Sequence, residues 1–480
     1  MQSLMESAVS IQLTPGIHIH VVGIGGAGMS AIARVLLGRG FHVSGSDKQS
    51  NAQTAALAAE GVTVYIGHAA EHIDGADMVV ISSAVPPTNP EWVAAETRGL
   101  PVLKRADLLG ALMQGAVGVA VAGSHGKTTT TGMIAHILME VGLDPTVILG
   151  GTLAELGGNG RFGDGPHFVV EADEYDYMFL GLRPEVAVIT NVEHDHPDLF
   201  PTADSYRAAF NRFATLLPPG GQLIICADDP GAVELLAEIE SGSIALTTYG
   251  LGEATTGVAP TVRALDTRPN QMGGSDFVVE IDGQTVGLAR IRLPGAHNVR
   301  NALAALTVAT NLQVDFSQAC RALAGFGGVQ RRFQLVGEVG GVTVIDDYAH
   351  HPTEIKATLA AARQRYPGRR LWAVWQPHTF SRTRLLLDQF ANSFAQADRV
   401  IALDIYASRE PVDPSITTAA VVERMGHSHA IHIPDRRNAA DYLLERLHPD
   451  DVVLTLGAGD GDVIGKWILE GLQLQQGNKR

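Results

Sequence analysis

The stretch Val117-Gly-Val-Ala-Val-Ala-Gly-Ser-His-Gly-Lys-Thr-Thr-Thr-Thr131 decides how the fold of this chain is interpreted. It begins as an apolar run of strand length, breaks at Gly123 and continues as an apolar helical pattern over residues 133–138. A glycine loop between a strand and a helix turns backbone N–H groups toward one point, where the helix N-terminus adds positive potential. Lys127 can then reach the β- and γ-phosphates, and the Thr128 hydroxyl can ligate Mg²⁺. We therefore predict a nucleoside triphosphate site here.

The composition is that of an ordinary globular protein. With 480 residues, 45% hydrophobic and 18% charged, the chain is long enough for two to four domains. Its net charge of −16 argues against a nucleic-acid surface. The only cysteines, Cys226 and Cys320, lie in apolar runs, which indicates buried free thiols and a reducing cytoplasm.

Two segments bear on targeting and membranes. Residues 1–10 have neither the basic region nor the apolar core of a secretion signal. Residues 108–122 are the most apolar run, but they are short, broken by polar and glycine residues, and lead into the glycine loop. We therefore expect a cytoplasmic protein without membrane insertion.

The first part of the chain contains a second glycine pattern. A strand at residues 17–22 is followed by Gly23-Ile-Gly-Gly-Ala-Gly-Met-Ser30 and a helical pattern, and the next strand ends at Ser46-Asp47. Such a turn binds a nucleotide diphosphate group, with an acid about 20 residues further on meeting a ribose hydroxyl. The alternative is a tight strand–helix turn with no ligand. The candidate residues are Gly25, Gly26, Gly28, Met29, Ser30, Ser46, Asp47, Ser82 and Ser83.

Two acidic clusters follow strands of the central part. Residues 168–170 lead into Glu171-Ala-Asp-Glu174, and residues 186–190 lead into Asn191-Val-Glu-His-Asp-His196. Because the carboxyl ends of parallel strands share one edge of a sheet, both clusters should face the glycine loop. Carboxylate and imidazole groups beside a triphosphate indicate Mg²⁺ or Mn²⁺. A solvated acidic loop is the alternative, and spacing alone does not separate His194 from His196.

The rest of the chain adds a short excursion and a further sheet. Residues 241–275 are rich in Gly, Ser and Thr and predict loops with a small antiparallel excursion. Asn298, near the start of an alanine-rich helix, either contacts a purine or caps the helix. From about Gly327, strands ending in polar residues alternate with helical patterns, one of them near residues 385–394. Arg332 and Arg382 suit bidentate recognition of phosphate or carboxylate.

These patterns predict an α/β fold of three domains. The first is a Rossmann-like N-terminal domain (residues 1–112), the second a central P-loop ATPase-like α/β domain (residues 113–326), and the third a C-terminal Rossmann-like domain (residues 327–480).

The order of the motifs resembles the Mur ligase family. It runs G-x-G-G-x-G-M-S, G-S-H-G-K-T-T, E-A-D-E, N-V-E-H-D-H, P-G-x-H-N-x-x-N-A, R-R-F, D-D-Y-A-H-H-P-T-E, Q-P-H-T-F-S-R and G-A-G-D. The resemblance covers nearly the whole chain. It implies an ATP-dependent, ADP-forming ligation of L-alanine to the lactyl carboxylate of UDP-N-acetylmuramate through an acyl phosphate, in peptidoglycan synthesis. A sister activity, the addition of a recycled tripeptide to the same sugar nucleotide, is the alternative.

The resemblance also implies roles for individual residues. The glycine-loop candidates of the first domain would bind the UDP-sugar. ATP would be bound by Gly123, Ser124, His125, Gly126, Lys127, Thr128, Thr129, Asn298, Arg332 and Asp346. Tyr348, His350, His378 and Arg382 would surround the alanine. The metal would be held by Thr128, Glu171 and His196, and the catalytic set would be Lys127, Glu171, His196, His350 and Arg382.

Two residues depart from the family pattern. Tyr175 stands where many relatives have Ser, and Thr379 stands where many have an Arg that contacts the alanine carboxylate. Two other classes of protein fit the sequence less well. A dehydrogenase would use the first glycine turn for NAD but would leave the Gly-Lys-Thr loop unexplained. A switch or motor NTPase would explain that loop but not the two further sheets. The oligomeric state stays open.

Overall fold

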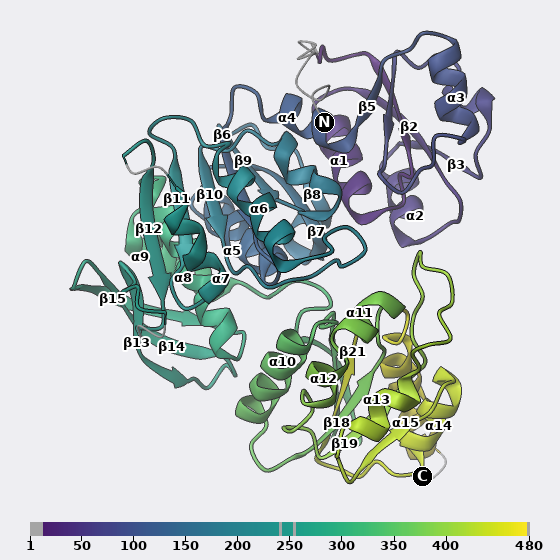
Figure 1. Ribbon diagram of the computed structural model, residues 1–480, viewed down its shortest axis with the longest axis vertical. Helices are drawn as coiled ribbons and strands as arrows, with labels where there is room; N and C mark the ends of the chain where they lie inside the picture. Colours follow the sequence, from purple (N-terminus) through teal and green to yellow (C-terminus); the bar gives the residue numbers. More distant parts are fainter. Residues whose placement is uncertain (1–12, 240–241, 253–255, 478–480) are drawn as a thin grey trace.

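The strands of the computed structural model form three separate sheets (Figure 1). The structure describes residues 13–239, 242–252 and 256–477, so the expectation for residues 1–10 lies outside it. Each sheet lies within one of the three predicted ranges, which confirms the three-domain α/β class, while the domain bounds themselves stay predictions. Within the described ranges no helix is long and apolar enough to cross a membrane.

The N-terminal sheet is fully parallel, with the strand order β3-β2-β1-β4-β5. Val22 at the end of β1 lies opposite Ser46, so the glycine loop and the Ser46-Asp47 pair share one edge, as predicted. The elements are β1 (His18–Val22), α1 (Ala27–Gly38), β2 (His42–Asp47), α2 (Ala52–Ala59), β3 (Thr63–Ile66), η1 (Ala70–Ile73), β4 (Met78–Ile81), α3 (Pro90–Thr97), β5 (Val102–Lys104) and α4 (Arg105–Met113).

The central sheet has ten strands in the order β15-β14-β13-β12-β11-β10-β6-β9-β7-β8. The predicted strand, glycine loop and helix are observed as β6 (Val117–Ala122) and α5 (Lys127–Glu140). The other elements are β7 (Thr146–Leu153), η2 (Ala154–Leu156), β8 (Gly158–Arg161), β9 (His167–Glu171), η3 (Tyr175–Gly181), β10 (Val186–Ile189), α6 (Ala203–Ala214), β11 (Gln222–Cys226), α7 (Pro230–Glu234), η4 (Leu235–Ala237), β12 (Ala245–Gly250), β13 (Val262–Pro269), β14 (Ser275–Ile281), β15 (Gln284–Ile291), α8 (Ala296–Asn311) and α9 (Phe316–Gly325).

The Gly/Ser/Thr-rich region contains more strand than the sequence predicted. An antiparallel excursion is present, since β13, β14 and β15 pair antiparallel. Residues 245–250, however, are not a loop, because β12 extends the parallel sheet beside β11. The β-branched and aromatic residues of Ala-Leu-Thr-Thr-Tyr-Gly suit a strand. Tyr249, which is 1% exposed, ties β12 to the core.

The C-terminal sheet has the order β16-β17-β21-β18-β19-β20, and only the β16–β17 pair is antiparallel. Its elements are β16 (Gln334–Val339), β17 (Val342–Asp347), α10 (Pro352–Arg365), β18 (Arg370–Trp375), α11 (Phe380–Leu385), α12 (Leu387–Ala391), β19 (Arg399–Ala402), α13 (Thr418–Arg424), β20 (Ala430–His432), α14 (Arg436–Leu444), β21 (Asp451–Leu456) and α15 (Val463–Gly477).

The helix predicted near residues 385–394 is confirmed in part, as the shorter helix α12 (Leu387–Ala391). The chain forms two short helices, because Leu386 leaves the helical conformation (φ −106°, ψ 21°). Its side chain, 6% exposed, packs in the same buried cluster as Phe390. Burial of one leucine therefore interrupts a pattern that is helical by sequence.

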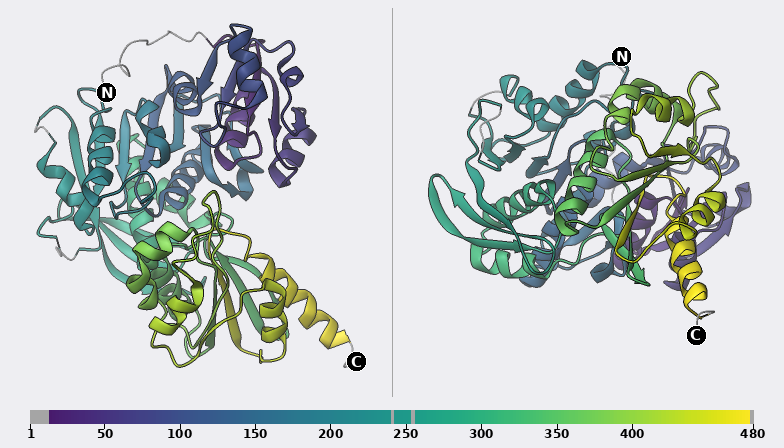
Figure 2. Two further views of the ribbon diagram at one scale, coloured as in Figure 1. Left: turned by 45° about the vertical axis from the view of Figure 1, so that its right-hand side comes forward. Right: turned by 90° about the horizontal axis from the view of Figure 1, so that it is seen from below.

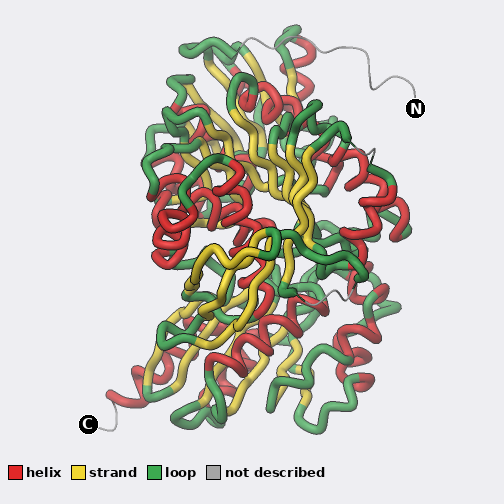
Figure 3. The backbone as a smooth tube through the Cα atoms, turned by 90° about the vertical axis from the view of Figure 1, so that its left-hand side faces the viewer, coloured by secondary structure: helices red, strands yellow, loops and turns green. Residues whose placement is uncertain are grey.

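The central domain contacts both of its neighbours (Figure 2). Helices flank the strands on both sides of the molecule in the view of Figure 3. One cluster of buried apolar side chains runs from β1 and α1 into one face of the central sheet, whereas the clusters of the C-terminal domain contain only residues from that domain. A cavity lies where the central and C-terminal domains meet.

Candidate active site

A cavity of about 300 Å³ opens between the central and C-terminal domains. The glycine loop, the ends of β10, β11 and β12, and the start of α8 line it from the central domain. The segment before β16, the end of β17 and the helix α10 line it from the C-terminal domain. The lining residues are His125, Gly126, Thr129, Thr190, Asn191, Glu193, Cys226, Asp228, Asp229, Tyr249, His297, Asn298, Arg300, Asn301, Arg332, Phe333, Asp347, Thr353, Glu354, Ala357 and Thr358.

The glycine loop is built as the sequence predicts. Gly126 is the N-cap of α5 with φ 80°, a left-handed conformation that glycine adopts without strain. Lys127 folds back over the loop, with Nζ 3.2 Å from the carbonyl oxygen of Ser124 and 2.9 Å from Glu174 Oε2. Burial alone would lower the pKa of Lys127, but the carboxylates of Glu174, Asp173 and Glu171 together outweigh it and raise the pKa. The lysine is therefore a fixed cation at the phosphate loop.

The first acidic loop reaches the glycine loop directly. Thr128 Oγ1 donates to Glu171 Oε1 at 2.9 Å, and the backbone N–H of Gly150 donates to Glu171 Oε2 at 2.6 Å. These two predicted metal ligands are thus in contact. The third, His196, lies instead with its Nε2 3.7 Å from Glu174 Oε1, so Glu174 connects it to Lys127. Glu174 was predicted only as part of this acidic cluster, with no role of its own.

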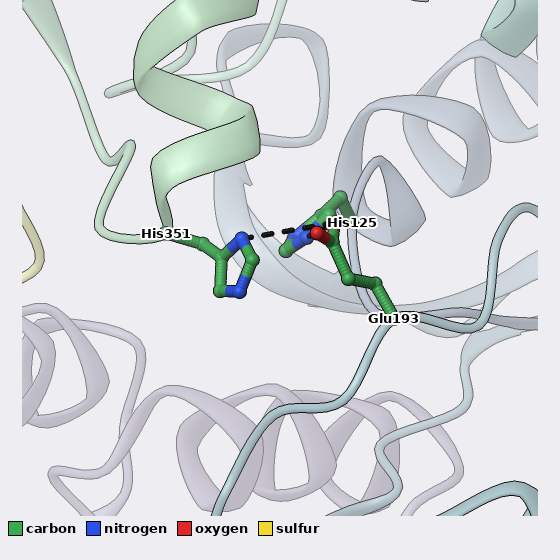
Figure 4. A group of neighbouring side chains, drawn as sticks. All are labelled: His125, Glu193 and His351. Atoms are coloured by element: carbon green, nitrogen blue, oxygen red, sulfur yellow. Dashed lines mark hydrogen bonds and ion pairs between the residues drawn. The ribbon is translucent and has the colours of Figure 1, made fainter. Parts of the chain in front are cut away.

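His125 joins the glycine loop to the C-terminal domain (Figure 4). Its Nε2 lies 3.1 Å from Glu193 Oε2, and its Nδ1 lies 3.5 Å from Glu354 Oε1. Burial alone would lower the pKa of His125, but Glu354 and Glu193 reverse the effect and raise the pKa to about 10. Burial would raise the pKa of Glu193, yet His125 and its other neighbours lower it to about 2. At neutral pH this is an imidazolium between two carboxylates.

His125, Glu193 and His351 could also be considered as metal ligands. One ligand atom of each lies within 4.8 Å of the others, and Figure 4 shows the three side chains meeting from separate segments. A metal-bound imidazole must be deprotonated at its ligating nitrogen. Because the pKa of His125 is raised to about 10, protonation competes with a metal at this position. Both nitrogens of His125 already face carboxylates, Glu193 at 3.1 Å and Glu354 at 3.5 Å, which is the geometry of an interdomain ion pair.

The N-terminus of α10 explains how Glu354 comes to face His125. His351 is the N-cap and Glu354 is the third residue, and together they form a capping box in which Glu354 Oε2 accepts from the His351 N–H at 3.2 Å. Pro352 occupies the first turn. Glu354 thus caps the helix with one oxygen and pairs with His125 through the other. The capping pattern in His-Pro-Thr-Glu was the signal that could have identified it.

The four residues expected around the alanine form one cluster. The imidazoles of His350 and His378 lie edge to face at 5.9 Å, and Tyr348 packs against His350 at 5.5 Å. Arg382, 3% exposed, donates from Nε to Asp195 Oδ1 at 2.8 Å and from Nη1 to His378 Nδ1 at 3.0 Å. A residue of the second acidic loop therefore holds the arginine of the C-terminal domain.

The two histidines of this cluster are neutral at physiological pH. Burial lowers the pKa of His350 to about 3 and that of His378 to about 4. Asp195 behaves in the opposite way. Burial would raise the pKa of this carboxyl, but Arg382 holds it well below its usual range. The cluster thus combines neutral imidazoles with one neutralised ion pair.

Asp346 is not among the residues that line the cavity, although the family resemblance implied a contact with ATP. Its carboxylate accepts from Thr455 Oγ1 at 2.6 Å and from Arg331 Nε at 2.9 Å. Successive side chains of a strand point to opposite faces, so the next residue, Asp347, is the one that reaches the cavity. Burial raises the pKa of Asp347 to about 6. The geometry favours Asp347 over Asp346 as the ligand-facing carboxylate.

Two roles were predicted for Asn298 at the start of α8, and the structure contradicts one of them. Asn298 lines the cavity and donates from Nδ2 to the carbonyl oxygen of Pro294 at 2.8 Å. The N-cap of α8 is Gly295, without a side-chain cap. Capping by Asn298 was therefore wrong, and a ligand contact stays the prediction for it.

In the first domain the structure divides the candidate residues into two groups. Asp47 Oδ2 accepts from the Gly25 N–H at 2.9 Å, and Ser82 packs beside Gly23 at the end of β4, with Ser83 exposed next to it. Met29, Ser30 and Ser46 are buried; Ser46 donates to Glu91, and Ser30 accepts from Asn159. Their side chains are used within the protein.

Comparisons with known proteins agree with this arrangement. Three family models match the chain: Mur ligase family, catalytic domain (residues 18–116); Mur ligase middle domain (residues 121–309); and Mur ligase, glutamate ligase domain (residues 331–459). A UDP-N-acetylmuramate–L-alanine ligase of Salinibacter ruber is 46% identical over 447 residues, covering 92% of each chain. One of Roseiflexus sp. is 45% identical over 472 residues, covering 95% of this chain and all of the other.

Solved structures give the same picture. The crystal structure of the UDP-N-acetylmuramate–alanine ligase MurC of Thermotoga maritima superposes with a TM-score of 0.80 at 29% identity, over 96% of this chain and 100% of that one. The murein peptide ligase of Psychrobacter arcticus superposes with a TM-score of 0.69 at 26% identity, over 95% and 99% of the two chains.

Proposed function

The chain belongs to the Mur ligase family, and we propose that it joins L-alanine to the lactyl carboxylate of UDP-N-acetylmuramate with ATP, through an acyl phosphate. The observation that carries this proposal is the full-length identity of about 45% to ligases of that name, which spans all three domains. The reaction belongs to peptidoglycan synthesis and takes place in the cytoplasm. Addition of a recycled tripeptide is the weaker alternative, since the peptide ligase is less similar.

The chemistry begins with activation of a poor acyl donor. A lactyl oxygen attacks the γ-phosphorus of ATP, ADP leaves, and the acyl phosphate forms. Lys127 stabilises the charge that develops on the transferred group, in a site where most catalysis is positioning and electrostatics. Its contact with Glu174 keeps the ammonium at the loop.

Thr128 and Glu171 fit the role of holding Mg²⁺ (or Mn²⁺). Both offer oxygen atoms, the ligands that Mg²⁺ prefers, and those atoms lie 2.9 Å apart. His196 is the proposed third ligand. When bound, the ion would supply positive charge to the phosphates during transfer.

In the second half-reaction the neutral alanine amine attacks the acyl carbon, phosphate leaves, and the proton lost from the nitrogen passes to a neighbouring carboxylate or imidazole. His350 and His378 are neutral, because burial lowers the pKa of each, so they add no positive charge that would repel the amino acid. Arg382 is paired with Asp195, which joins the alanine cluster to the metal-side loop and favours reaction only when the two domains are closed. Closure excludes water, which would hydrolyse the acyl phosphate.

Phosphate release is the assay that tests this function. With ATP and UDP-N-acetylmuramate present, L-alanine should support turnover, glycine and L-serine should be poorer, and the tripeptide should be inactive. Lys127→Ala should lower activity at least about 10³-fold, or about 4 kcal/mol of transition-state stabilisation. Lys466→Ala, an exposed lysine on α15, is the matched control. Turnover with the tripeptide but not with L-alanine would replace the proposal with its alternative.

A further inference from the structure

Arg105 is a cation that none of the predicted sites includes. It is the first residue of α4, and its guanidinium lies on Gly28 of the first glycine loop: a Cβ placed on Gly28 would be 2.2 Å from Arg105 Cζ. This contact sets a positive charge at the N-terminus of α1. A cation at the positive end of a helix is unfavourable unless an anion joins it. The position itself therefore calls for a negatively charged group.

The protein does not fully satisfy this guanidinium. Its nearest carboxylate is that of Asp173, with Nη1 and Oδ2 3.7 Å apart, whereas a charge-assisted hydrogen bond measures about 2.8 Å. Arg105 Nε is buried and has no hydrogen-bond partner among the residues that the structure describes. The side chain is only 16% exposed. A planar group with five donors is thus held in the interior by one loose ion pair.

The backbone of Arg105 is fixed by close packing between two domains. The helix α4 of the N-terminal domain lies on η3, which follows the first acidic loop. A Cβ on Gly110 would be 2.3 Å from the carbonyl oxygen of Gly181, and one on Gly181 would be 2.5 Å from that of Ala106. Because backbones touch on both sides, α4 has little freedom to move. Any change of partner must come from the Arg105 side chain.

We propose that Arg105 is a positioning residue that binds the pyrophosphate of the nucleotide sugar seated on the glycine loop, exchanging Asp173 for phosphate oxygens. The inference rests on the proposed function, which supplies the nucleotide. A guanidinium binds phosphate bidentately and so pairs better with pyrophosphate than with a carboxylate 3.7 Å away. The exchange also releases Asp173, two residues from Glu171, when the first site fills.

Equilibrium binding of UDP and uridine to the full chain, without ATP, tests the exchange. Arg105→Ala should weaken UDP binding at least tenfold and leave uridine binding unchanged, because uridine has no phosphate. Asp173→Asn should strengthen UDP binding severalfold, because it removes the competing carboxylate. Arg98→Ala is the matched control: Arg98 is 41% exposed, pairs with Asp74 at 2.7 Å, and should change neither affinity.

The opposite directions separate ligand binding from a structural role. An ion pair that only supports the fold would make Arg105→Ala and Asp173→Asn weaken UDP binding together, or leave both at the wild-type value, and either result overturns the proposal. If Arg105→Ala does not fold, Arg105→Lys is the second variant, because it keeps the charge but lacks the paired N–H donors of the guanidinium. It should lose part of the UDP affinity, and wild-type affinity in Arg105→Lys would also overturn the proposal. Failure of the wild-type chain to bind UDP would instead refute the proposed function.

Discussion

The central domain meets its N-terminal neighbour mainly through apolar and backbone contacts, with the Arg105–Asp173 ion pair and the hydrogen bonds of Asn159 beside them, whereas its contacts with the C-terminal neighbour include buried ion pairs. On the first side, α1 packs on the β7–β8 hairpin, a Cβ on Gly160 would be 2.5 Å from the Ala31 carbonyl oxygen, and buried apolar residues of both domains form one cluster. On the second side, contacts include Arg382 with Asp195 at 2.8 Å and His125 with Glu354 at 3.5 Å.

The difference separates a permanent contact from one that can open. Separating the first interface would expose buried apolar side chains of both domains to water, which is unfavourable. This interface therefore behaves as part of the fold. Ion pairs can exchange water or substrate for their partners. Two further polar contacts join the central and C-terminal domains. Thr353 Oγ1 donates to Glu193 at 2.7 Å, and the Arg409 guanidinium lies 4.1 Å from the Tyr175 ring centroid. We expect closure of the site to take place at this interface.

Arg382→Ala should have the largest effect on the charged interface. It leaves Asp195, 3% exposed, as a buried charge without its partner, and breaking such a pair costs about 3–5 kcal/mol. If that cost falls on the closed state, kcat/KM for L-alanine should drop about 100-fold or more. The measurement is steady-state kinetics at varied L-alanine. Arg384→Ala on the same helix, 56% exposed, should be close to wild type. Equal activity of the two variants would show that the Arg382–Asp195 ion pair does not contribute to closure.

Gly160→Ala should act on the other interface and change stability more than chemistry. The added methyl would meet the backbone of α1, which cannot rotate away. Such overpacking costs about 1–3 kcal/mol, and Tm should fall by several degrees. The KM for the nucleotide sugar should rise, while that for L-alanine should stay unchanged. Gly327→Ala, with nothing within 4 Å, is the control for calorimetry. An unchanged Tm would mean that the hairpin and α1 separate easily.

The sequence predicted the features that are made of residues close together along the chain. The glycine loop, both acidic loops and the polar ends of the C-terminal strands could be predicted, because an apolar run followed by Gly, Asp or His marks a strand end in a parallel sheet. Contacts between distant segments could not. Nothing in the spacing indicates that Arg382 pairs with Asp195, 187 residues away. The choice between Asp346 and Asp347 depends on which way β17 faces, and a shift of one residue reverses it.

The interface between the central and C-terminal domains should weaken at acid pH. Burial lowers the pKa of His351 and His378 to about 4 and that of His350 to about 3, below the ordinary value of 6.5. Their contribution to closure is therefore present above pH 6.5 and is lost as the pH falls toward 4. Hydrogen-exchange protection factors at the start of α10 should fall at least about tenfold between pH 7.5 and 5. Protection of β8 should not, since its contacts with α1 do not titrate in this range.

The ion pair between His125 and Glu354 should depend on pH in the opposite direction, because it should weaken at alkaline pH. This gives a second test of the charged interface. Its pKa is raised to about 10, so its pairing with Glu354 is complete below pH 6.5 and is lost as the pH rises through 10. In His125→Gln, protection at α10 should no longer depend on pH between 8 and 10, while the loss below pH 6.5 should remain. If the substitution abolished the acid effect instead, the buried neutral histidines of the C-terminal domain would not be its cause.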